Sequence, residues 1–179
     1  TCPNNREIAF RYPSHCYAAW ITNKEKREIC ASGGIGTELS EFIIKHGGII
    51  FGSRYDEQLN PIITWTDSIT ELERFKGSRY VQSKVGEKTY KQVKEFLRTG
   101  KQVLYIGTPC QIAGLYGFLK KSYDNLITVD LICHGVSPSI YLKEEVEYLT
   151  EKYGLKNVSD IRFRGNDGNN YRLTLWNKD

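Results

Sequence analysis

The stretch at residues 102–136 reads QVLYIGTPCQIAGLYGFLKKSYDNLITVDLICHGV, and its pattern sets the architecture. Two apolar runs, at 102–106 and 126–132, have the length and the β-branched content of buried strands. Between them, Pro109 to Lys120 has the composition of a helix. A strand, a helix and a strand in this order predict a right-handed parallel βαβ unit.

The flanking sequence extends this unit in both directions. A helix predicted at 138–153 and a strand predicted at 158–164 continue the alternation, so the strand is expected in the same parallel sheet. A polar turn at 165–170 and a strand at 171–176 then predict an antiparallel ribbon at the C-terminal end. Upstream, strands are predicted at 16–21, 49–52 and 62–66, and helices from 32–36, from 68–71 and over 87–99. The expected fold class is α/β, with a mostly parallel sheet, flanking helices and a C-terminal antiparallel ribbon.

Composition narrows the function classes. The chain has 179 residues, of which 40% are hydrophobic and 26% charged, and this excludes a disordered, collagenous or disulfide-dense protein. No apolar run approaches the roughly 18 residues that span a bilayer, so a cytoplasmic protein without a membrane span is expected. Nine Lys or Arg and two Glu lie between Arg74 and Lys101. This basic segment favours an anionic small ligand over nucleic acid, and a solvated helix face is the alternative.

Two cysteines are predicted to carry chemistry. Thr108, Pro109 and Gln111 form a capping pattern at a helix start, but helix stability does not explain Cys110 between them. The positive end of a helix dipole favours an anionic thiolate there. Cys133 follows the next strand, so both thiols are expected at one edge of the sheet, where open α/β sheets bind ligands. The alternative is that both are small hydrophobic residues.

Two further segments have the composition of anion-binding loops. The sequence SGGIG at 32–36 opens a helix with small residues that let phosphate oxygens approach backbone N–H groups. It lacks the third glycine of a nicotinamide-binding fingerprint, although Asp56 has the spacing of a ribose-binding acid. The sequence GSRYVQSK at 77–84 combines hydroxyls, an amide, cations and an aromatic ring. Such a set can clamp a pyrophosphate, and a surface loop is the alternative.

Four blocks occur together in a diagnostic order: SGG at 32–34, GSRYVQS at 77–83, GTPCQIAGL at 107–115 and DLICHGV at 130–136. Over about residues 15–165 the chain resembles the coenzyme F-420 hydrogenase/dehydrogenase beta subunit family, which includes the plant hydroxymethyl chlorophyll a reductase. The resemblance implies an iron–sulfur flavoprotein oxidoreductase. Such a protein passes electrons between a ferredoxin-like partner, a 4Fe-4S cluster, FAD and a small hydride-exchanging substrate, of which coenzyme F-420 is one option.

The resemblance also implies residue roles and a domain organisation. Cys110 and Cys133 would ligate the cluster, with the remaining ligands outside this chain. Residues 1–15, with Cys2-Pro3, would be the remnant of an upstream ferredoxin-like domain or linker. Residues 16–179 would be a flavin-binding α/β domain, truncated at its C-terminal end. The implied flavin-site residues are Ser32, Gly33, Gly34, Ser78, Arg79, Gln82, Ser83, Lys84, Thr108 and Gln111.

Two alternatives from other function classes stay open. One is a cysteine-nucleophile enzyme that uses Cys110 and His134 and needs no cofactor. The other is a nucleotide-binding module without catalytic activity. A zinc site is not expected, because the sequence contains no CxxC pair.

Overall fold

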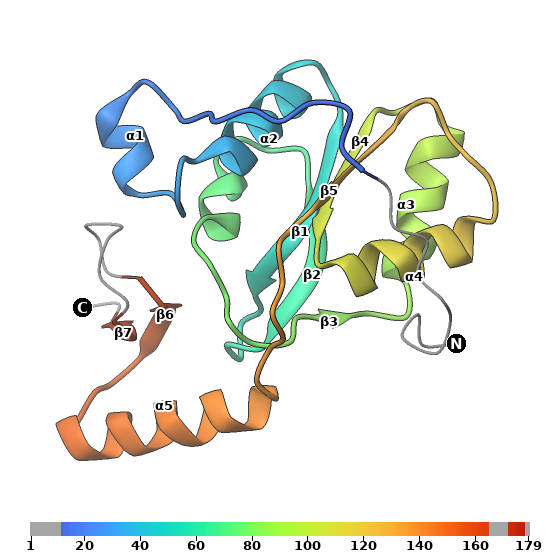
Figure 1. Ribbon diagram of the computed structural model, residues 1–179. Coiled ribbons are helices and arrows are strands. Elements are labelled where there is room, and N and C mark those ends of the chain that lie inside the picture. The colour runs from blue at the N-terminus through green and yellow to red at the C-terminus, as the bar shows by residue number, and fades with distance from the viewer. Residues whose placement is uncertain (1–11, 165–171, 178–179) are drawn as a thin grey trace.

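The computed structural model describes residues 12–164 and 172–177. Five strands form one sheet in the order β3-β2-β1-β4-β5, and β6 pairs with β7 in a separate two-stranded ribbon (Figure 1). The strands are β1 Ile49–Tyr55, β2 Pro61–Thr66, β3 Lys84–Val85, β4 Val103–Gly107, β5 Leu126–Asp130, β6 Val158–Arg162 and β7 Thr174–Asn177. The helices are α1 Lys24–Glu28, α2 Ile35–Lys45, the 3-10 helix η2 Glu71–Phe75, α3 Thr89–Arg98, α4 Pro109–Leu119 and α5 Ser139–Tyr153.

The predicted βαβ unit is confirmed. Strands β4 and β5 pair in parallel from Val103 opposite Leu126 to Gly107 opposite Asp130, and α4 connects them. Strand β1 pairs in parallel with β4 and antiparallel with β2, with which it forms a hairpin. Strands β2 and β3 are again parallel. The expected fold class, a mostly parallel α/β sheet with flanking helices and a C-terminal ribbon, is therefore confirmed.

Helices cover both faces of the sheet. Because side chains alternate along a strand, Phe51 and Tyr105 point to the face covered by α3 and α4, and their rings stack with centroids 5.9 Å apart. Ile50 and Leu104 point to the opposite face, where they pack with the apolar side of α2 and with η2. These central strand residues are all fully buried, so the sheet is rigid where β1 meets β4.

The ribbon is not part of the main sheet, so the prediction of a third parallel strand at 158–164 was wrong. Beyond β5, residues 131–138 run across the sheet instead of starting the next crossover beside it (Figure 1). A bridge from Ser137 to Val81 holds this crossing segment. Helix α5 and the ribbon then form their own cluster, in which Leu142 and Ile161 pack with Tyr55 and Val81. The expected turn at 165–170 lies outside the described residues.

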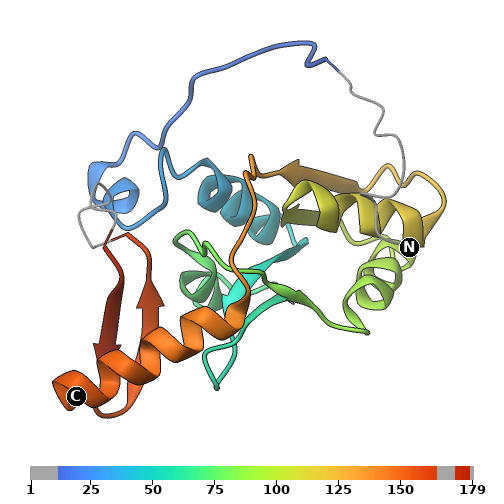
Figure 2. The same cartoon turned by 60° about the horizontal axis from the view of Figure 1, so that its bottom comes forward.

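Two other sequence predictions need correction. The run at 126–132 was expected to be a buried strand, but β5 is an edge strand, and Ile127 and Ile132 are 40% and 93% exposed. The run at 16–21 was expected to be a strand, but residues 12–20 are extended, exposed and unpaired, and form an arc beside the body (Figure 2). Strand propensity cannot supply the neighbouring edge that pairing requires. Cys2-Pro3 lies outside the described residues.

Within the residues that the structure describes, no helix combines the length and the apolar character needed to cross a bilayer.

Candidate functional site

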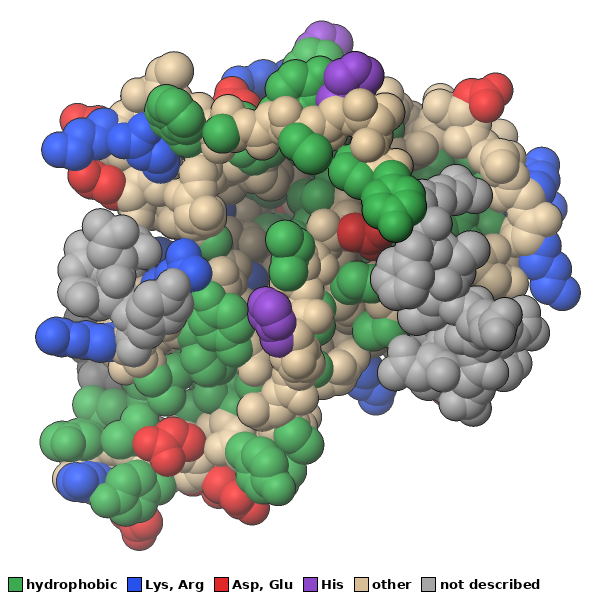
Figure 3. All heavy atoms as spheres, in the orientation of Figure 1, with side chains coloured by type: hydrophobic (Ala, Val, Ile, Leu, Met, Phe, Trp, Pro, Cys, Tyr) green, Lys and Arg blue, Asp and Glu red, His purple; other side chains and the backbone are tan. Residues whose placement is uncertain are grey.

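A cavity of about 530 Å³ opens at the carboxyl ends of β4 and β5. Its floor comes from β1 at residues 50–53, and two of its walls are the segments at 75–83 and 131–136. The N-terminal part of α2 forms a third wall. The space-filling view shows this face hollowed near its centre (Figure 3). The cavity therefore lies at the sheet edge where open α/β folds bind ligands, as expected from the order of the elements.

The cavity gathers most of the residues singled out in the sequence. Its lining includes Gly34, Ser78, Arg79, Gln82, Ser83, Thr108, Gln111 and Cys133. Four predicted site residues are not part of the lining, namely Ser32, Gly33, Lys84 and Cys110. Three segments that are distant in the sequence thus meet around one space, which is what the order of their motifs predicts.

The start of α4 is fixed by the predicted capping box. The N–H of Thr108 donates to Gln111 Oε1 at 3.0 Å, and Pro109 occupies the first turn. The amide of Gln111 is buried, and its Nε2 donates to the carbonyl of Ser83 at 3.0 Å. Gln111 therefore joins the helix start to the loop across the cavity, and both ends of its amide are engaged by the protein.

The loop at residues 77–83 is held from several sides. The hydroxyls of Ser83 and Ser53 share a hydrogen bond at 2.6 Å, which ties the loop to β1. The N–H of Gln82 donates to the carbonyl of Ser137 at 3.2 Å, which ties it to the crossing segment. The loop is thus a fixed wall of the cavity.

Arg79 binds the backbone of its own loop. Its Nη2 donates to the carbonyl of Arg74 at 2.7 Å, and its Nη1 lies 3.3 to 3.4 Å from the carbonyls of Phe75, Lys76 and Gly77. The guanidinium also stacks on Tyr55, 4.9 Å from the ring centroid. Burial lowers the pKa of Arg79, partly offset by Tyr55 and Asp160. Arg79 therefore shapes the loop while adding positive charge beside the cavity.

The glycines before α2 are required by packing within the chain. A Cβ on Gly33 would lie 2.7 Å from the carbonyl oxygen of Ala19, and the N–H of Ile21 donates to the carbonyl of Gly33 at 2.8 Å. Gly34 has a φ of +77°, and a Cβ there would lie 2.5 Å from Ile21 Cδ1. The SGG motif thus seats residues 19–21 against the helix start, and only Gly34 of its three residues borders the cavity.

The nicotinamide alternative loses its acidic residue. Asp56 lies in the turn of the β1–β2 hairpin, where its carboxylate accepts hydrogen bonds from the backbone N–H groups of Gln58 and Asn60. Burial alone would raise the pKa of Asp56, but these hydrogen bonds outweigh it and lower the pKa. The carboxylate closes a turn and does not line the cavity.

The charge of the lining is one-sided. Lys76 and Arg79 line the cavity, and none of the described residues that line it is Asp or Glu. The basic segment predicted from the sequence contributes only these two of its nine cations, and the rest lie elsewhere. Ile50, Phe75 and Ile106 add apolar area that the motifs did not indicate. An apolar floor with cations on one wall suits a planar aromatic ligand that carries an anionic group.

The described cysteines do not form a cluster site by themselves. Cys110 and Cys133 are exposed, and only Cys133 borders the cavity, while Cys110 Sγ lies 3.2 Å from Thr108 Oγ1. Cys16 is exposed, and Cys30 is buried with its thiol 3.3 Å from Thr37 Oγ1. Residues 12–164 and 172–177 contain no group of three His, Cys, Asp or Glu placed to hold a metal. A 4Fe-4S cluster takes four thiolates, so this part of the chain does not fit it alone.

The cysteine-nucleophile alternative gains no support from the geometry. His134 borders the cavity, whereas Cys110 is not part of its lining. Among the described residues, the hydrogen-bond partner found for Cys110 is Thr108 and not His134.

The fold and the cavity define an α/β ligand-binding protein whose site lies at the carboxyl ends of parallel strands. Residues 100–179 match the family described as the C-terminal part of the beta subunit of coenzyme F420 hydrogenase/dehydrogenase, and they belong to that family. The family assignment made from the motifs is therefore confirmed.

Solved structures share the fold. A chain in the F420-reducing [NiFe] hydrogenase complex from Methanosarcina barkeri superposes with a TM-score of 0.58 at 19% sequence identity. The match covers 89% of this chain and 55% of that chain, so the present chain spans about half the length of that relative. No protein with a curated description matches the chain.

Proposed function

We propose that the chain is the flavin-binding module of an iron–sulfur flavoprotein oxidoreductase. In this proposal it binds FAD in the cavity at the carboxyl ends of β4 and β5. It then exchanges electrons with a ferredoxin-like partner and a hydride with a small-molecule substrate. The proposed location is the cytoplasm, where free thiols stay reduced.

The cavity carries the proposal. Its volume of about 530 Å³ falls within the roughly 300 to 1,000 Å³ of small-molecule and cofactor sites. Its apolar floor suits a flavin ring, and Lys76 and Arg79 suit the negative charge of the phosphates. The membership of residues 100–179 in the F420 hydrogenase/dehydrogenase beta subunit family agrees with this assignment.

The proposed FAD contacts follow from the lining. Ser78 and Gln82 present polar side chains from the loop, and Gly34 and Thr108 come from the two helix starts. Gln111 and Ser83 are engaged with each other and hold the wall in place. Bound flavin would supply the hydride chemistry, and these residues would orient the ring and exclude water around it.

Cys110 and Cys133 stay proposed cluster ligands, with further ligands from outside the described residues. The deciding measurement is iron content after anaerobic purification of the protein with its ferredoxin-like partner. Cys110→Ser and Cys133→Ser should each abolish bound iron and leave the circular dichroism unchanged, because both side chains are exposed. Cys16→Ser, also at an exposed cysteine, is the matched control and should keep its iron. Unchanged iron in either test variant would remove that residue from the ligand set.

Flavin binding is tested by titrating the protein with FAD and following the loss of flavin fluorescence. We expect saturable one-to-one binding, which Gly52→Leu should weaken by at least ten-fold because Gly52 lines the cavity. Gly117→Ala, on α4 with nothing within 4 Å of an added Cβ, is the control and should bind as the unmodified protein does. Absence of binding in the unmodified protein would contradict the proposal. A colourless protein whose activity is lost on alkylation of Cys110 would favour the nucleophile alternative.

A further inference from the structure

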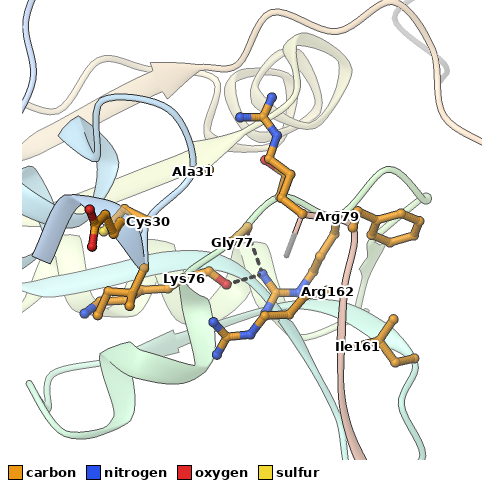
Figure 4. A pocket seen from close by; sticks show the side chains of 12 residues that line it. Cys30, Ala31, Lys76, Gly77, Arg79, Ile161 and Arg162 are labelled. Atoms are coloured by element: carbon orange, nitrogen blue, oxygen red, sulfur yellow. Dashed lines mark hydrogen bonds between the residues drawn. The ribbon is translucent and has the colours of Figure 1, made fainter. Parts of the chain in front are cut away.

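A narrow crevice adjoins the main cavity, on the side of the ribbon. One wall consists of residues 76–79, the second consists of residues 161–164 at the end of β6, and the third consists of residues 28–31 (Figure 4). The volume of the crevice is about 20 Å³, which is room for little more than one water molecule. The stretch from Lys76 to Arg79 lines both the crevice and the main cavity, so the two spaces meet along this stretch.

Cations from two separate elements converge on this junction. Lys76 and Arg79 come from the loop after η2, and Arg162 and Arg164 come from the ribbon. Figure 4 shows Arg79 and Arg162 crossing the same space. The charge of Arg162 contributes to the lowered pKa of Arg79, after the larger effect of burial. Two guanidinium groups this close in a half-buried site repel each other unless an anion lies between them.

The protein compensates these charges only in part. Arg162 Nε pairs with Asp160 Oδ2 at 2.9 Å, and Lys76 pairs with Glu73. Arg79 has only backbone carbonyls as hydrogen-bond acceptors, and its buried Nε has no partner among the described residues. Arg54, whose charge also bears on Arg79, likewise has a buried Nη1 without a partner in that part of the chain. A buried, unpartnered guanidinium nitrogen is costly, so it indicates a missing acceptor.

We propose that this junction is a phosphate-binding subsite, in which Arg162 of the ribbon and Arg79 of the loop bind one phosphate group between them. The proposal rests on the proposed function, because the phosphate would belong to a ligand seated in the main cavity. The group lies at the mouth of the crevice, since the crevice itself is too small to enclose it. Arginine suits this role because its planar fork binds phosphate oxygens in pairs. The ribbon thus becomes a specificity element of the site and not only a cover for α5.

The test uses inorganic pyrophosphate as the probe, with binding measured by calorimetry at low salt. The protein should bind it saturably, and Arg162→Gln should weaken binding by about ten-fold or more, the usual effect of losing a charge-assisted hydrogen bond. Arg162→Lys keeps the charge but not the fork and should show a smaller loss. Arg98→Gln, at the exposed end of α3, is the control and should leave the affinity unchanged. Circular dichroism of each variant checks that it is folded.

Two flavin ligands distinguish the sources of the phosphate. If Arg162→Gln weakens FAD but not riboflavin, the group belongs to the dinucleotide. If both flavins bind normally while pyrophosphate is weakened, it belongs to a separate phosphorylated substrate. Failure of the unmodified protein to bind pyrophosphate, or equal binding by Arg162→Gln, would overturn the subsite. Failure of flavin binding with intact, Arg162-dependent pyrophosphate binding would instead contradict only the proposed function.

Discussion

The starts of α2 and α4 both border the cavity, yet their sequences are held in opposite ways. At α4, side chains make the structure: Gln111 accepts from Thr108 and donates to Ser83, so a polar side chain joins two walls of the site. At α2, the absence of side chains makes the structure: Gly33 and Gly34 let residues 19–21 approach to a distance that a Cβ would prevent. Glycines at a helix start next to a cavity are therefore not by themselves a sign of a bound phosphate.

The sharpest test of the α4 side is Gln111→Ala. It removes both hydrogen bonds of the buried amide and leaves the Ser83 carbonyl and the Thr108 N–H without these partners. We expect a loss of about 2 to 4 kcal/mol in the free energy of unfolding, measured by urea denaturation. Flavin affinity should fall with it, because the loop at 77–83 loses its attachment to α4.

Gln111→Glu separates packing from hydrogen bonding at this position. The carboxylate can still accept from Thr108 but cannot donate to the Ser83 carbonyl. A variant as stable as the original protein would contradict the role given to the Nε2 donor.

The corresponding test of the α2 side is Gly34→Ala. Its φ of +77° is unfavourable for alanine, and the new Cβ would meet the Ile21 side chain. We expect a destabilisation of about 1 to 2 kcal/mol, less than for Gln111→Ala, because the end of the Ile21 side chain can move. The double variant Gly34→Ala/Ile21→Ala should recover part of this loss only if the clash contributes to it. A neutral Gly34→Ala would show that α2 does not depend on this contact.

Alkaline pH should affect the α4 side through tyrosine. The Tyr90 hydroxyl donates to the carbonyl of Gln111 at 2.7 Å, and burial raises the pKa of both Tyr90 and Tyr105. A tyrosine whose pKa is raised on folding adds stability that is complete below about pH 10, its value in unfolded chains, and is lost above it.

Urea unfolding at about pH 8 and about pH 11 would measure this alkaline loss of stability. Tyr90→Phe should cost about 1 kcal/mol at the lower pH and show a smaller further loss at the higher one. Tyr148→Phe, on the exposed side of α5, is the control and should follow the original protein. Equal pH dependence in Tyr90→Phe would contradict the assignment to Tyr90.

The smallest expected effect comes from a glycine with no packing role. Gly117 lies within α4, and nothing is within 4 Å of an added Cβ. Gly117→Ala should therefore stabilise the protein by about 0.5 to 1 kcal/mol through helix propensity, which thermal unfolding would detect. A loss of stability there would mean that the contrast between packed and unpacked glycines does not hold in this fold.

Much of the fold around the site was predictable because its signals are local. The β4–α4–β5 unit combines two apolar runs with a capping box, and each of these patterns depends on neighbours within a few residues. The same local pattern failed at 126–132 and at 158–164. Whether a strand is central or at an edge, and which sheet it joins, depends on the path of the chain at 131–138, which no local pattern encodes.

The candidate site divides along the same line. The motifs correctly brought residues from three segments to one cavity, because parallel strands present their carboxyl ends at one edge. They could not tell that Arg79 would bind carbonyl oxygens of its own loop. The ribbon cations Arg162 and Arg164 lie outside every motif, and the fold alone brings them to the crevice.

The sequence by itself determined the α/β class, the central βαβ unit, the family and the edge of the sheet where a ligand binds. Periodicity and capping carry this information over short distances along the chain. Only the tertiary structure decided which residues face the cavity, which glycines serve packing and which cations meet at the crevice. Those outcomes depend on distances between segments far apart in the chain, and these distances are set by how the sheet, the crossing segment and the ribbon pack together.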